Sequence, residues 1–494
     1  MLSKIRNLIS SPADLIALYL FTIYHYVRCN IGWPARKFYL TAICIIAFGW
    51  ELIRLVRSRR LIRERRPIRS RPDRITLITL LLGASIILTA VFSPYGKWAY
   101  DPDNVEEGAL IWTVYLFIFL LMREEYHPKK AHLILYLISG YIECFLVIIN
   151  NCIINIFGNN IAIYGNPNLL GLGMALLYSL NLFMLINESD PSTCLIHYIL
   201  AFFFSIGLIL CRSDNTLLCI MTLLALLPFL LQITADRLKK LLILSALLLL
   251  GMAAVHLLSK LPYKSQYSVT CLLMDLSLKI SPVLTAASGI VFLVIQALIP
   301  QKCSFPRLTK NLRISVIVIL SVLVVGIVLA NVAGVSFGAA NRILRIDDSW
   351  GTSRGYVWRC CLHAFGNFAT PLQKIFGTGI NSTPYFTWDH IREMVATLPQ
   401  NFCTPHNFLI QSLLEGGILG LILICLFIYL PLQNGIKHKN CSKTLSAAMA
   451  AVILAGLLVT VPSPDITPYL IVFLAVCAAK PEKDQQSIPL AEAD

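Results

Sequence analysis

The sequence predicts an all-α polytopic membrane protein with about 12–14 transmembrane helices. Of its 494 residues, 57% are hydrophobic and only 14% are charged, whereas an ordinary soluble domain is about 25% charged. A water-exposed surface around a core of this size needs more charge than the chain contains. The composition therefore excludes a soluble cytosolic enzyme, a disordered protein and a secreted disulfide scaffold.

Apolar runs suited to crossing about 30 Å of hydrocarbon recur along the chain. The segment 267–280 is not among them, because Asp275 and Lys279 favour an interfacial or re-entrant piece. The runs at 108–122 and 466–479 are short, which lowers the expected number of spans to twelve or thirteen if they fail to cross. We expect membrane helices at roughly 12–27, 38–56, 75–92, 108–122, 131–157, 167–186, 195–211, 216–233, 239–258, 283–299, 313–334, 407–431, 445–461 and 466–479.

The charges in the loops predict the orientation. The net charge is +15, and an excess of Lys and Arg is typical of the cytoplasmic loops of membrane proteins. We therefore expect no nucleic-acid partner. The connection 54–74 is crowded with arginine, which predicts that it lies in the cytoplasm. We assign the successive loops alternately to the two sides of the membrane, starting from this connection. Both termini are then expected in the cytoplasm, and the loops 93–107 and 335–405 on the outer side of the cytoplasmic (inner) membrane.

The loop 335–405 is the longest segment without an apolar run. Loops of this length are usually functional or disordered, and its many aromatic residues predict a folded cap on the membrane surface. Apolar residues at helical spacing predict a helix from about Thr352 to Ala369, followed by a turn at Gly377-Thr378-Gly379. We divide the chain into N-terminal transmembrane helices (1–334), this large loop (335–405), C-terminal transmembrane helices (406–480) and a cytoplasmic tail (481–494).

Most cysteines lie inside apolar runs and are expected to pack as small apolar residues. Three others, Cys360, Cys361 and Cys403, lie in the outer loop. An oxidising space outside the membrane would permit a disulfide there. Whether Cys403 pairs with Cys360 or with Cys361 stays open.

His406 is the first candidate for chemistry. Thr404-Pro405-His406-Asn407 opens a long apolar run, and Thr404 is expected as the N-cap, with Pro405 in the first turn. The positive end of the helix dipole disfavours an imidazolium ion. A neutral ring that accepts a proton at pH 7 is therefore expected. The alternative is an interfacial histidine that only bonds to the loop.

Glu415 is the second candidate, since an intramembrane carboxylate is costly and marks a functional hypothesis by default. Asn407, Gln411 and Glu415 are spaced four residues apart, so they form one polar stripe on a helix. The alternative is that Glu415 is a structural anchor between helices.

Arginines at the expected outer face are candidates for bidentate phosphate binding. Arg354 precedes the predicted loop helix, Arg359 lies on it, and Arg212 follows the run 195–211. The alternative is that each guanidinium extends to lipid headgroups. Asn166 is the expected N-cap of the run that begins at Pro167.

Metal and cofactor signatures are weak. Asp101-Pro102-Asp103 resembles the DxD metal pattern of some glycosyltransferases, and Asp347-Asp348 is similar. The chain has no HExxH, paired CxxC or P-loop motif. We expect no metal ion and no cofactor.

Three groups of residues together resemble the O-antigen ligase family of membrane proteins, which includes O-antigen polymerases. The resemblance covers roughly residues 160–425, and its motifs follow the order expected for the family. They are Asn166-Pro167-Asn168 with Leu170-Gly171, then Ser353-Arg354-Gly355-Tyr356-Val357-Trp358 with Phe376-Gly377-Thr378-Gly379, and finally Pro405-His406-Asn407 with Leu414-Glu415-Gly416.

The resemblance implies a GT-C-like glycosyltransferase that moves a glycan from an undecaprenyl-pyrophosphate carrier to an acceptor glycan or glycolipid, without metal. His406 would activate the acceptor hydroxyl, and Arg354 would be one of two arginines that hold the pyrophosphate. Family members commonly carry Ser-Arg where this chain reads Arg212-Ser213, so Arg359 and Arg342 are substitutes for Arg212. Supporting positions are Glu415, Asn407, Gln411, Trp358, Asn166 and Asn168.

The ligase and polymerase functions differ only in the acceptor, and the sequence leaves both open. A different class of function is a polysaccharide or lipid-linked glycan transporter or flippase without chemistry. It would predict inverted repeats and charged residues near the midplane of several helices, whereas midplane charge here is nearly confined to Glu415. A structural membrane scaffold is the third hypothesis.

Overall fold

The computed structural model describes residues 8–24, 33–59, 72–96, 99, 107–154, 166–261, 271–300, 303–396, 404–437 and 440–479. Within these ranges the regular structure is helical, apart from one isolated antiparallel bridge between Thr234 and Ser304. The predicted all-α polytopic membrane fold is confirmed.

Each of the fourteen predicted apolar runs coincides with a helix. The apolar residues are continuous rather than periodic, so a helix satisfies its backbone groups internally wherever the run lies in lipid. The helices are α2 (Pro12–Phe21), α4 (Trp33–Arg59), α5 (Arg74–Phe92), α7 (Ala109–Glu125), α8 (Lys130–Cys152), α9 (Pro167–Ile186), α10 (Pro191–Leu210), α11 (Asp214–Leu230), α12 (Ala235–Leu258), α14 (Pro282–Leu298), α15 (Pro306–Asn331), α20 (Phe408–Lys437), α21 (Cys441–Leu457) and α22 (Thr467–Ala478).

Fewer of these helices are long enough to span a bilayer than the sequence predicted. In the part of the chain that the structure describes, seven helices meet the length and hydropathy required, or eight if α13 (Leu272–Lys279) and α14 form one span. These two helices meet at 105°, in the region where a re-entrant piece was expected. Apart from the 27-residue α4, the other apolar helices have 17 residues or fewer. The 12 residues of α22 rise only about 18 Å.

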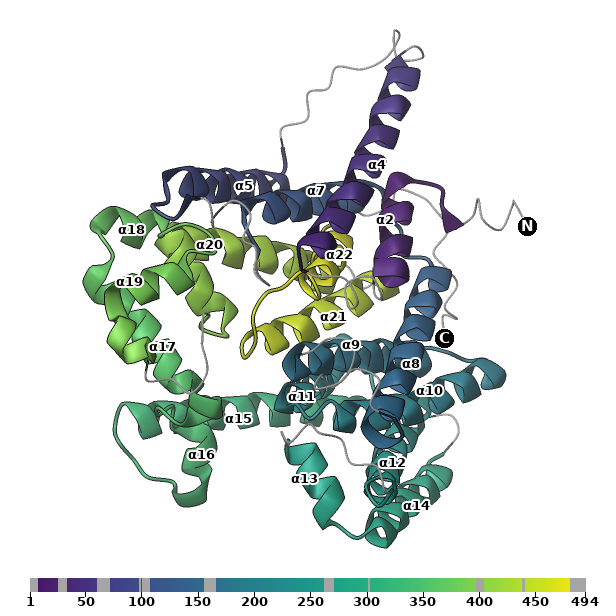
Figure 1. The fold of residues 1–494 in the computed structure, drawn as a ribbon. Coiled ribbons are helices and arrows are strands. Elements are labelled where there is room, and N and C mark those ends of the chain that lie inside the picture. The colour runs from purple at the N-terminus through teal and green to yellow at the C-terminus, as the bar shows by residue number, and fades with distance from the viewer. Residues whose placement is uncertain are drawn as a thin grey trace.

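The short helix α22 is instead a core element, because all of its residues are buried. It packs against α7, α20 and α21, and α21 also packs against α9 and α11. The bundle thus has two groups of helices joined through α21, and Figure 1 shows α5, α7 and α20 on one side of α21 and α9 to α12 on the other. By contrast, α15 lies at the periphery, with 6% of its most apolar window buried.

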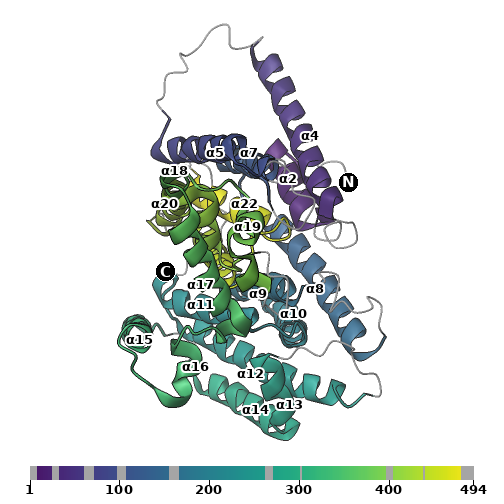
Figure 2. The same ribbon diagram turned by 60° about the vertical axis from the view of Figure 1, so that its left-hand side comes forward.

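The described part of the large loop contains a 3-10 helix (Gly338–Ala340) and four α-helices, α16 (Asn341–Leu344), α17 (Trp350–Phe368), α18 (Pro371–Phe376) and α19 (Thr383–Ala396). The predicted helix at 352–369 is therefore confirmed as α17. Cys360 and Phe386 belong to a small core between α17 and α19, while Cys361 packs with Leu414 of α20. Cys360 and Cys361 are free thiols, and Cys403 lies outside the described residues. Figure 2 shows α17 to α19 stacked along the α20 side of the bundle.

Candidate functional site

The helix that follows the outer loop begins later than the sequence predicted. Its first residue is Phe408, and Asn407 caps it, because Asn407 Oδ1 accepts two backbone N–H groups of the first turn at 3.0 and 3.1 Å. The expected cap at Thr404 is wrong. The reason is that His406 has a φ of +48°, a left-handed conformation that turns the chain before the helix starts.

The His406 ring is held by its own turn. Its Nδ1 lies 3.1 Å from both the carbonyl oxygen and the Oγ1 of Thr404. A proton on Nδ1 satisfies the carbonyl, and the neutral ring then carries its lone pair on Nε2. Burial lowers the pKa of His406, and the nearby Arg354 guanidinium lowers it further, although the hydrogen bond to Thr404 acts in the opposite direction. The ring therefore stays neutral at pH 7.

The same turn is fixed to the outer loop through Trp358. The indole Nε1 of Trp358 donates a hydrogen bond of 2.7 Å to the carbonyl oxygen of Pro405. The Trp358 ring also packs against Trp350, with 5.2 Å between centroids. The predicted supporting role of Trp358 thus has a geometric basis, since the side chain joins α17 to the residue before His406.

Arg354 lies in the first turns of α17, where the backbone is tightly constrained. A Cβ at Gly355 would lie 1.9 Å from the carbonyl oxygen of Asp347, so only glycine fits there. Arg354 Nη1 donates to the carbonyl oxygen of Gly351 at 2.7 Å. Burial lowers the pKa of Arg354 and the charge of Asp214 raises it. The charge of Arg354 thus acts on His406, and the charge of Asp214, the first residue of α11, acts on Arg354.

The Asn166-Pro167-Asn168 element holds the turn that carries Arg212. Asn166 is the N-cap of α9, as predicted, and accepts a hydrogen bond from the backbone N–H of Asn168. Asn168 Oδ1 accepts a 2.8 Å hydrogen bond from Ser213 Oγ. A Cβ at Gly171 would lie 2.9 Å from the Cβ of Ser213. The element thus lets the start of α11 pack directly on α9 and fixes the residue after Arg212.

Strained backbone is concentrated around these residues. In the described ranges, four non-glycine residues have a positive φ: Arg212, Ser353, Asn381 and His406. Each costs about 1–3 kcal/mol and persists only where surrounding contacts impose it, often at functional sites. Two of the four, Arg212 and His406, are candidate site residues. Ser353 directly precedes another candidate, Arg354.

Arg359 lies apart from this set. Its guanidinium forms an exposed ion pair of 2.8 Å with Asp348 and lies over the Tyr356 ring. Arg342, the other proposed substitute, is exposed on α16. Of the arginines considered, Arg354 is the one whose charge acts on His406, and Arg212 lies in the turn before α11, whose first residue Asp214 acts on Arg354.

Glu415 is buried and acts as an acceptor for the outer loop. Its Oε1 accepts hydrogen bonds from Thr383 Oγ1 at 2.9 Å and from Gln411 Nε2 at 3.1 Å. The predicted Gln411–Glu415 stripe is therefore a hydrogen-bonded pair. Asn407, at the outer end of the stripe, donates instead to the carbonyl oxygen of Leu458 at 3.0 Å.

A break in α20 lets the Gly377-Thr378-Gly379 turn dock beside Glu415. The helix is interrupted at Gly417, which has a φ of +63°. The freed carbonyl oxygen of Glu415 accepts the Gly379 N–H at 3.1 Å. A Cβ at Gly377 would lie 2.0 Å from that carbonyl oxygen. These contacts favour the structural alternative for Glu415. The sequence did not predict that the Gly377-Thr378-Gly379 turn packs against the glycines that follow Glu415.

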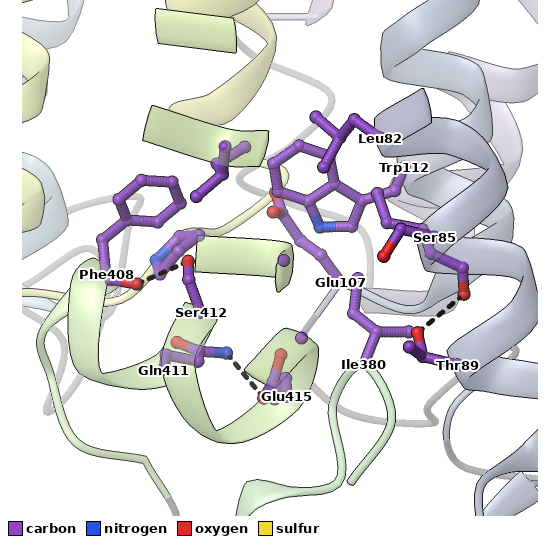
Figure 3. Close-up of a pocket in the computed structure, with 15 residues that line it drawn as sticks. Leu82, Ser85, Thr89, Glu107, Trp112, Ile380, Phe408, Gln411, Ser412 and Glu415 are labelled. Atoms are coloured by element: carbon purple, nitrogen blue, oxygen red, sulfur yellow. Dashed lines mark hydrogen bonds between the residues drawn. The ribbon is translucent and has the colours of Figure 1, made fainter. Parts of the chain in front are cut away.

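A pocket lies on another side of α20, which lines it together with residues of α5 and α7. Figure 3 shows Glu107, Trp112, Gln411 and Glu415 around it. The sequence analysis assigned no role to Glu107 or Trp112. The only sequence signal for this pocket was the carboxylate of Glu107, directly before the apolar run 108–122.

The described residues of the two weak DxD-like motifs do not form a group that could bind a metal ion. Asp347 accepts hydrogen bonds from the backbone and hydroxyl of Ser349, and Asp348 pairs with Arg359. Across the residues with described positions, no group of three or more His, Cys, Asp or Glu side chains could hold a metal ion. Asp101 and Asp103 lie outside those residues.

Comparison with known families identifies one segment. Residues 267–425 match the family described as O-antigen ligase, which confirms the resemblance found in the sequence. The matched segment contains Arg354, Trp358, His406 and Glu415, while Arg212 and the Asn166 element precede it. No curated protein and no solved structure matches the chain.

Proposed function

We propose that this protein, whose residues 267–425 form an O-antigen ligase domain, transfers a glycan from an undecaprenyl-pyrophosphate carrier to an acceptor hydroxyl outside the cytoplasmic membrane. The family match supports a membrane protein that joins or polymerises glycans. The carrier, the acceptor class and the absence of a metal requirement are part of the proposal. So are the orientation with cytoplasmic termini, and the division at residues 334, 405 and 480.

The observation that carries the proposal is the hydrogen bond from Trp358 to the Pro405 carbonyl oxygen, which joins the helix of Arg354 to the turn of His406, and the Arg354 charge lowers the pKa of His406. A cation keeps the histidine neutral and is itself suited to bind the leaving pyrophosphate. Base and anion site therefore adjoin each other, as a transfer reaction with a phosphate leaving group requires.

In the proposed reaction, His406 Nε2 accepts the proton of the acceptor hydroxyl. The hydroxyl oxygen forms a bond to the anomeric carbon of the donor sugar. The bond between that carbon and the pyrophosphate oxygen breaks, and its electron pair stays on the pyrophosphate, where Arg354 and Arg212 stabilise the charge. The pyrophosphate of the carrier is already a good leaving group. The reaction therefore needs a base for the acceptor hydroxyl and positive charge for the pyrophosphate, and His406 and the two arginines supply these.

Purified protein in liposomes tests the proposal when it is supplied with lipid-linked repeat units extracted from its host. A ladder of longer glycans from these units alone indicates a polymerase, and product only after a host glycolipid is added indicates a ligase. The His406→Ala variant should give neither product. Equal product from wild type and His406→Ala would refute the role of His406, and movement of intact lipid-linked glycan across the bilayer without any product would favour a flippase.

A further inference from the structure

The start of α17 brings two tryptophan rings into contact. The ring centroids of Trp350 and Trp358 are 5.2 Å apart, with 50° between the ring planes. Gly351 and Ser353, which lie between them, have φ values of +58° and +71°. These left-handed angles take the backbone out of the regular helical path, and the two rings meet although they are eight positions apart in the chain. We call these two residues the aromatic pair.

Both rings of the aromatic pair are fixed by their only hydrogen-bond donor. Trp358 Nε1 donates to the carbonyl oxygen of Pro405 at 2.7 Å, and Trp350 Nε1 donates to the carbonyl oxygen of Ile343 at 3.2 Å. An indole has no other polar atom, so each bond sets the orientation of its ring. Both side chains are nevertheless partly exposed. The pair is therefore a rigid aromatic surface with area left for a ligand.

The aromatic pair adjoins Arg354. Trp358 follows Arg354 by four residues, which places both on one face of α17. On the other side, a Cβ at Gly351 would lie 3.6 Å from the Cβ and the Cδ of Arg354. Arg354 Nη1 also donates to the carbonyl oxygen of Gly351 at 2.7 Å. The arginine side chain thus lies along the residue that follows Trp350, one turn before Trp358.

The same pair adjoins the turn of His406, because the Trp358 hydrogen bond ends at Pro405. In the proposed reaction the donor sugar is bonded to the pyrophosphate. Its anomeric carbon must lie where the leaving group reaches Arg354 and the attacking hydroxyl reaches His406, with the reacting atoms held in line. The aromatic pair contacts the elements that carry both residues. It is therefore the aromatic surface expected beside that sugar.

The surroundings of Trp350 favour a sugar over a lipid chain. The three residues directly before it, Asp347, Asp348 and Ser349, are polar and exposed, whereas the exposed apolar Ile343 lies further back, on α16. A pyranose ring has apolar C–H faces and hydroxyl groups around its edge. Ligand sites commonly combine an apolar or aromatic surface with a few polar groups, and an aromatic face with a polar rim suits such a ring.

We propose that Trp350, supported from behind by Trp358, contacts the first sugar of the lipid-linked donor, the sugar that is bonded to the pyrophosphate. A C–H face of this sugar packs on the Trp350 indole while the pyrophosphate lies at Arg354. The contact fixes the plane of the sugar ring and hence the direction of the bond that breaks. The inference rests on the proposed function, since it takes Arg354 as the pyrophosphate-binding residue.

Binding of two ligands that differ only in the sugar tests the proposal without turnover. The probes are radiolabelled host lipid-linked repeat units and radiolabelled undecaprenyl pyrophosphate, with the protein in liposomes. The His406→Ala background keeps the sugar-bearing probe intact. Trp350→Leu keeps an apolar side chain and removes the flat ring. We expect the Kd of the sugar-bearing probe to rise roughly tenfold, as for one lost aromatic contact, and the Kd of undecaprenyl pyrophosphate to stay unchanged.

Three further variants separate sugar contact from other effects. Trp350→Phe keeps a ring face and should weaken the sugar-bearing probe by no more than about threefold. Trp388→Leu is the matched control, since Trp388 is 46% exposed elsewhere on the outer loop, and it should leave both Kd values unchanged. Arg354→Gln should weaken both probes, because both contain the pyrophosphate.

Two results would overturn the assignment of Trp350. Equal weakening of both probes by Trp350→Leu would show that Trp350 only maintains the fold around Arg354. An unchanged Kd of the sugar-bearing probe in Trp350→Leu would show that no sugar contacts this ring, as expected for a tryptophan that meets only lipid headgroups.

The two proposals fail in different ways. Glycan transfer by the wild type, with a Trp350→Leu variant that binds the sugar-bearing probe normally, would refute the role of Trp350 and leave the transferase function standing. Sugar-dependent binding through Trp350 in a protein that transfers no glycan would refute the transferase function and leave a site that binds lipid-linked sugar.

Discussion

Trp358 donates its indole N–H to the carbonyl oxygen of Pro405 at 2.7 Å, and this bond joins the arginine-bearing helix of the outer loop to the turn that presents His406. The two residues are 47 positions apart in the chain. The proposed base and the proposed phosphate-binding cation, Arg354, are therefore positioned by this bond together with the packing of α17 on Leu414 of α20.

Trp358→Phe removes this hydrogen bond and keeps an aromatic ring. We expect kcat for glycan transfer to fall roughly tenfold or more, because small misplacements of catalytic groups cost up to about 10²-fold, while the amount of folded protein is unchanged. Trp388→Phe is the matched control, since Trp388 is 46% exposed and lies elsewhere on the loop. Equal kcat in the two variants would show that the bond is dispensable.

The pH dependence of transfer should report His406. Because burial and Arg354 lower the pKa of His406, kcat/KM should fall only when the pH drops through this lowered pKa. Removing the positive charge with Arg354→Gln should raise the pKa of His406, so the acid limb of the residual activity moves to higher pH. Arg354→Lys keeps the charge and should leave the limb in place.

A shift of equal size in both Arg354 variants would contradict the electrostatic explanation. The same pair also tests phosphate binding. A bidentate contact predicts that lysine fails to restore the affinity for the lipid-linked donor, measured as KM, even though it restores the pH profile.

Gly377→Ala should detach the outer loop from the membrane helices. The new Cβ would lie 2.0 Å from the carbonyl oxygen of Glu415, and the φ of +90° adds strain of about 1–3 kcal/mol. We expect loss of transfer and faster proteolysis within residues 335–405. Gly366→Ala is the control, because a Cβ there meets nothing within 4 Å. Identical proteolysis of the two variants would refute the docking role of the turn.

Substitutions of Glu415 separate an anchor from an acid–base group. Glu415→Gln keeps an oxygen that accepts from Thr383 and should retain transfer within a few fold. Glu415→Ala leaves the buried Thr383 hydroxyl and Gln411 amide without this acceptor, at a cost of about 1–3 kcal/mol each. Transfer should then fall strongly, together with the protease resistance of the loop. An inactive Glu415→Gln variant with a protease-resistant loop would instead indicate proton transfer by Glu415.

The sequence was most informative about the membrane helices. A run such as 167–186 is continuously apolar, and in a bilayer such a run has few alternatives to a helix, so its bounds agree with α9. The number of spans was harder to predict. Hydropathy does not distinguish a lipid-facing helix such as α15 from the short buried helix α22, because both are apolar on all sides.

The candidate site was predictable in its residues but not in its contacts. His406 and Arg354 were identified from motifs, yet their proximity depends on α17 packing against α20 across a long loop. Thr404 was assigned as the helix cap because a left-handed residue at His406 has no signature in the sequence. The pocket escaped prediction for a similar reason, since Glu107 and Gln411 line one pocket only because α5 packs against both α7 and α20.

The central claim is tested most directly by measuring the release of undecaprenyl pyrophosphate alongside the formation of glycosidic bonds. Wild-type protein in liposomes, supplied with host lipid-linked repeat units and host glycolipid, should release one carrier pyrophosphate for each glycan joined, and His406→Ala should release none above the protein-free control. Release at the wild-type rate by His406→Ala, or joined glycans without released carrier, would contradict the account.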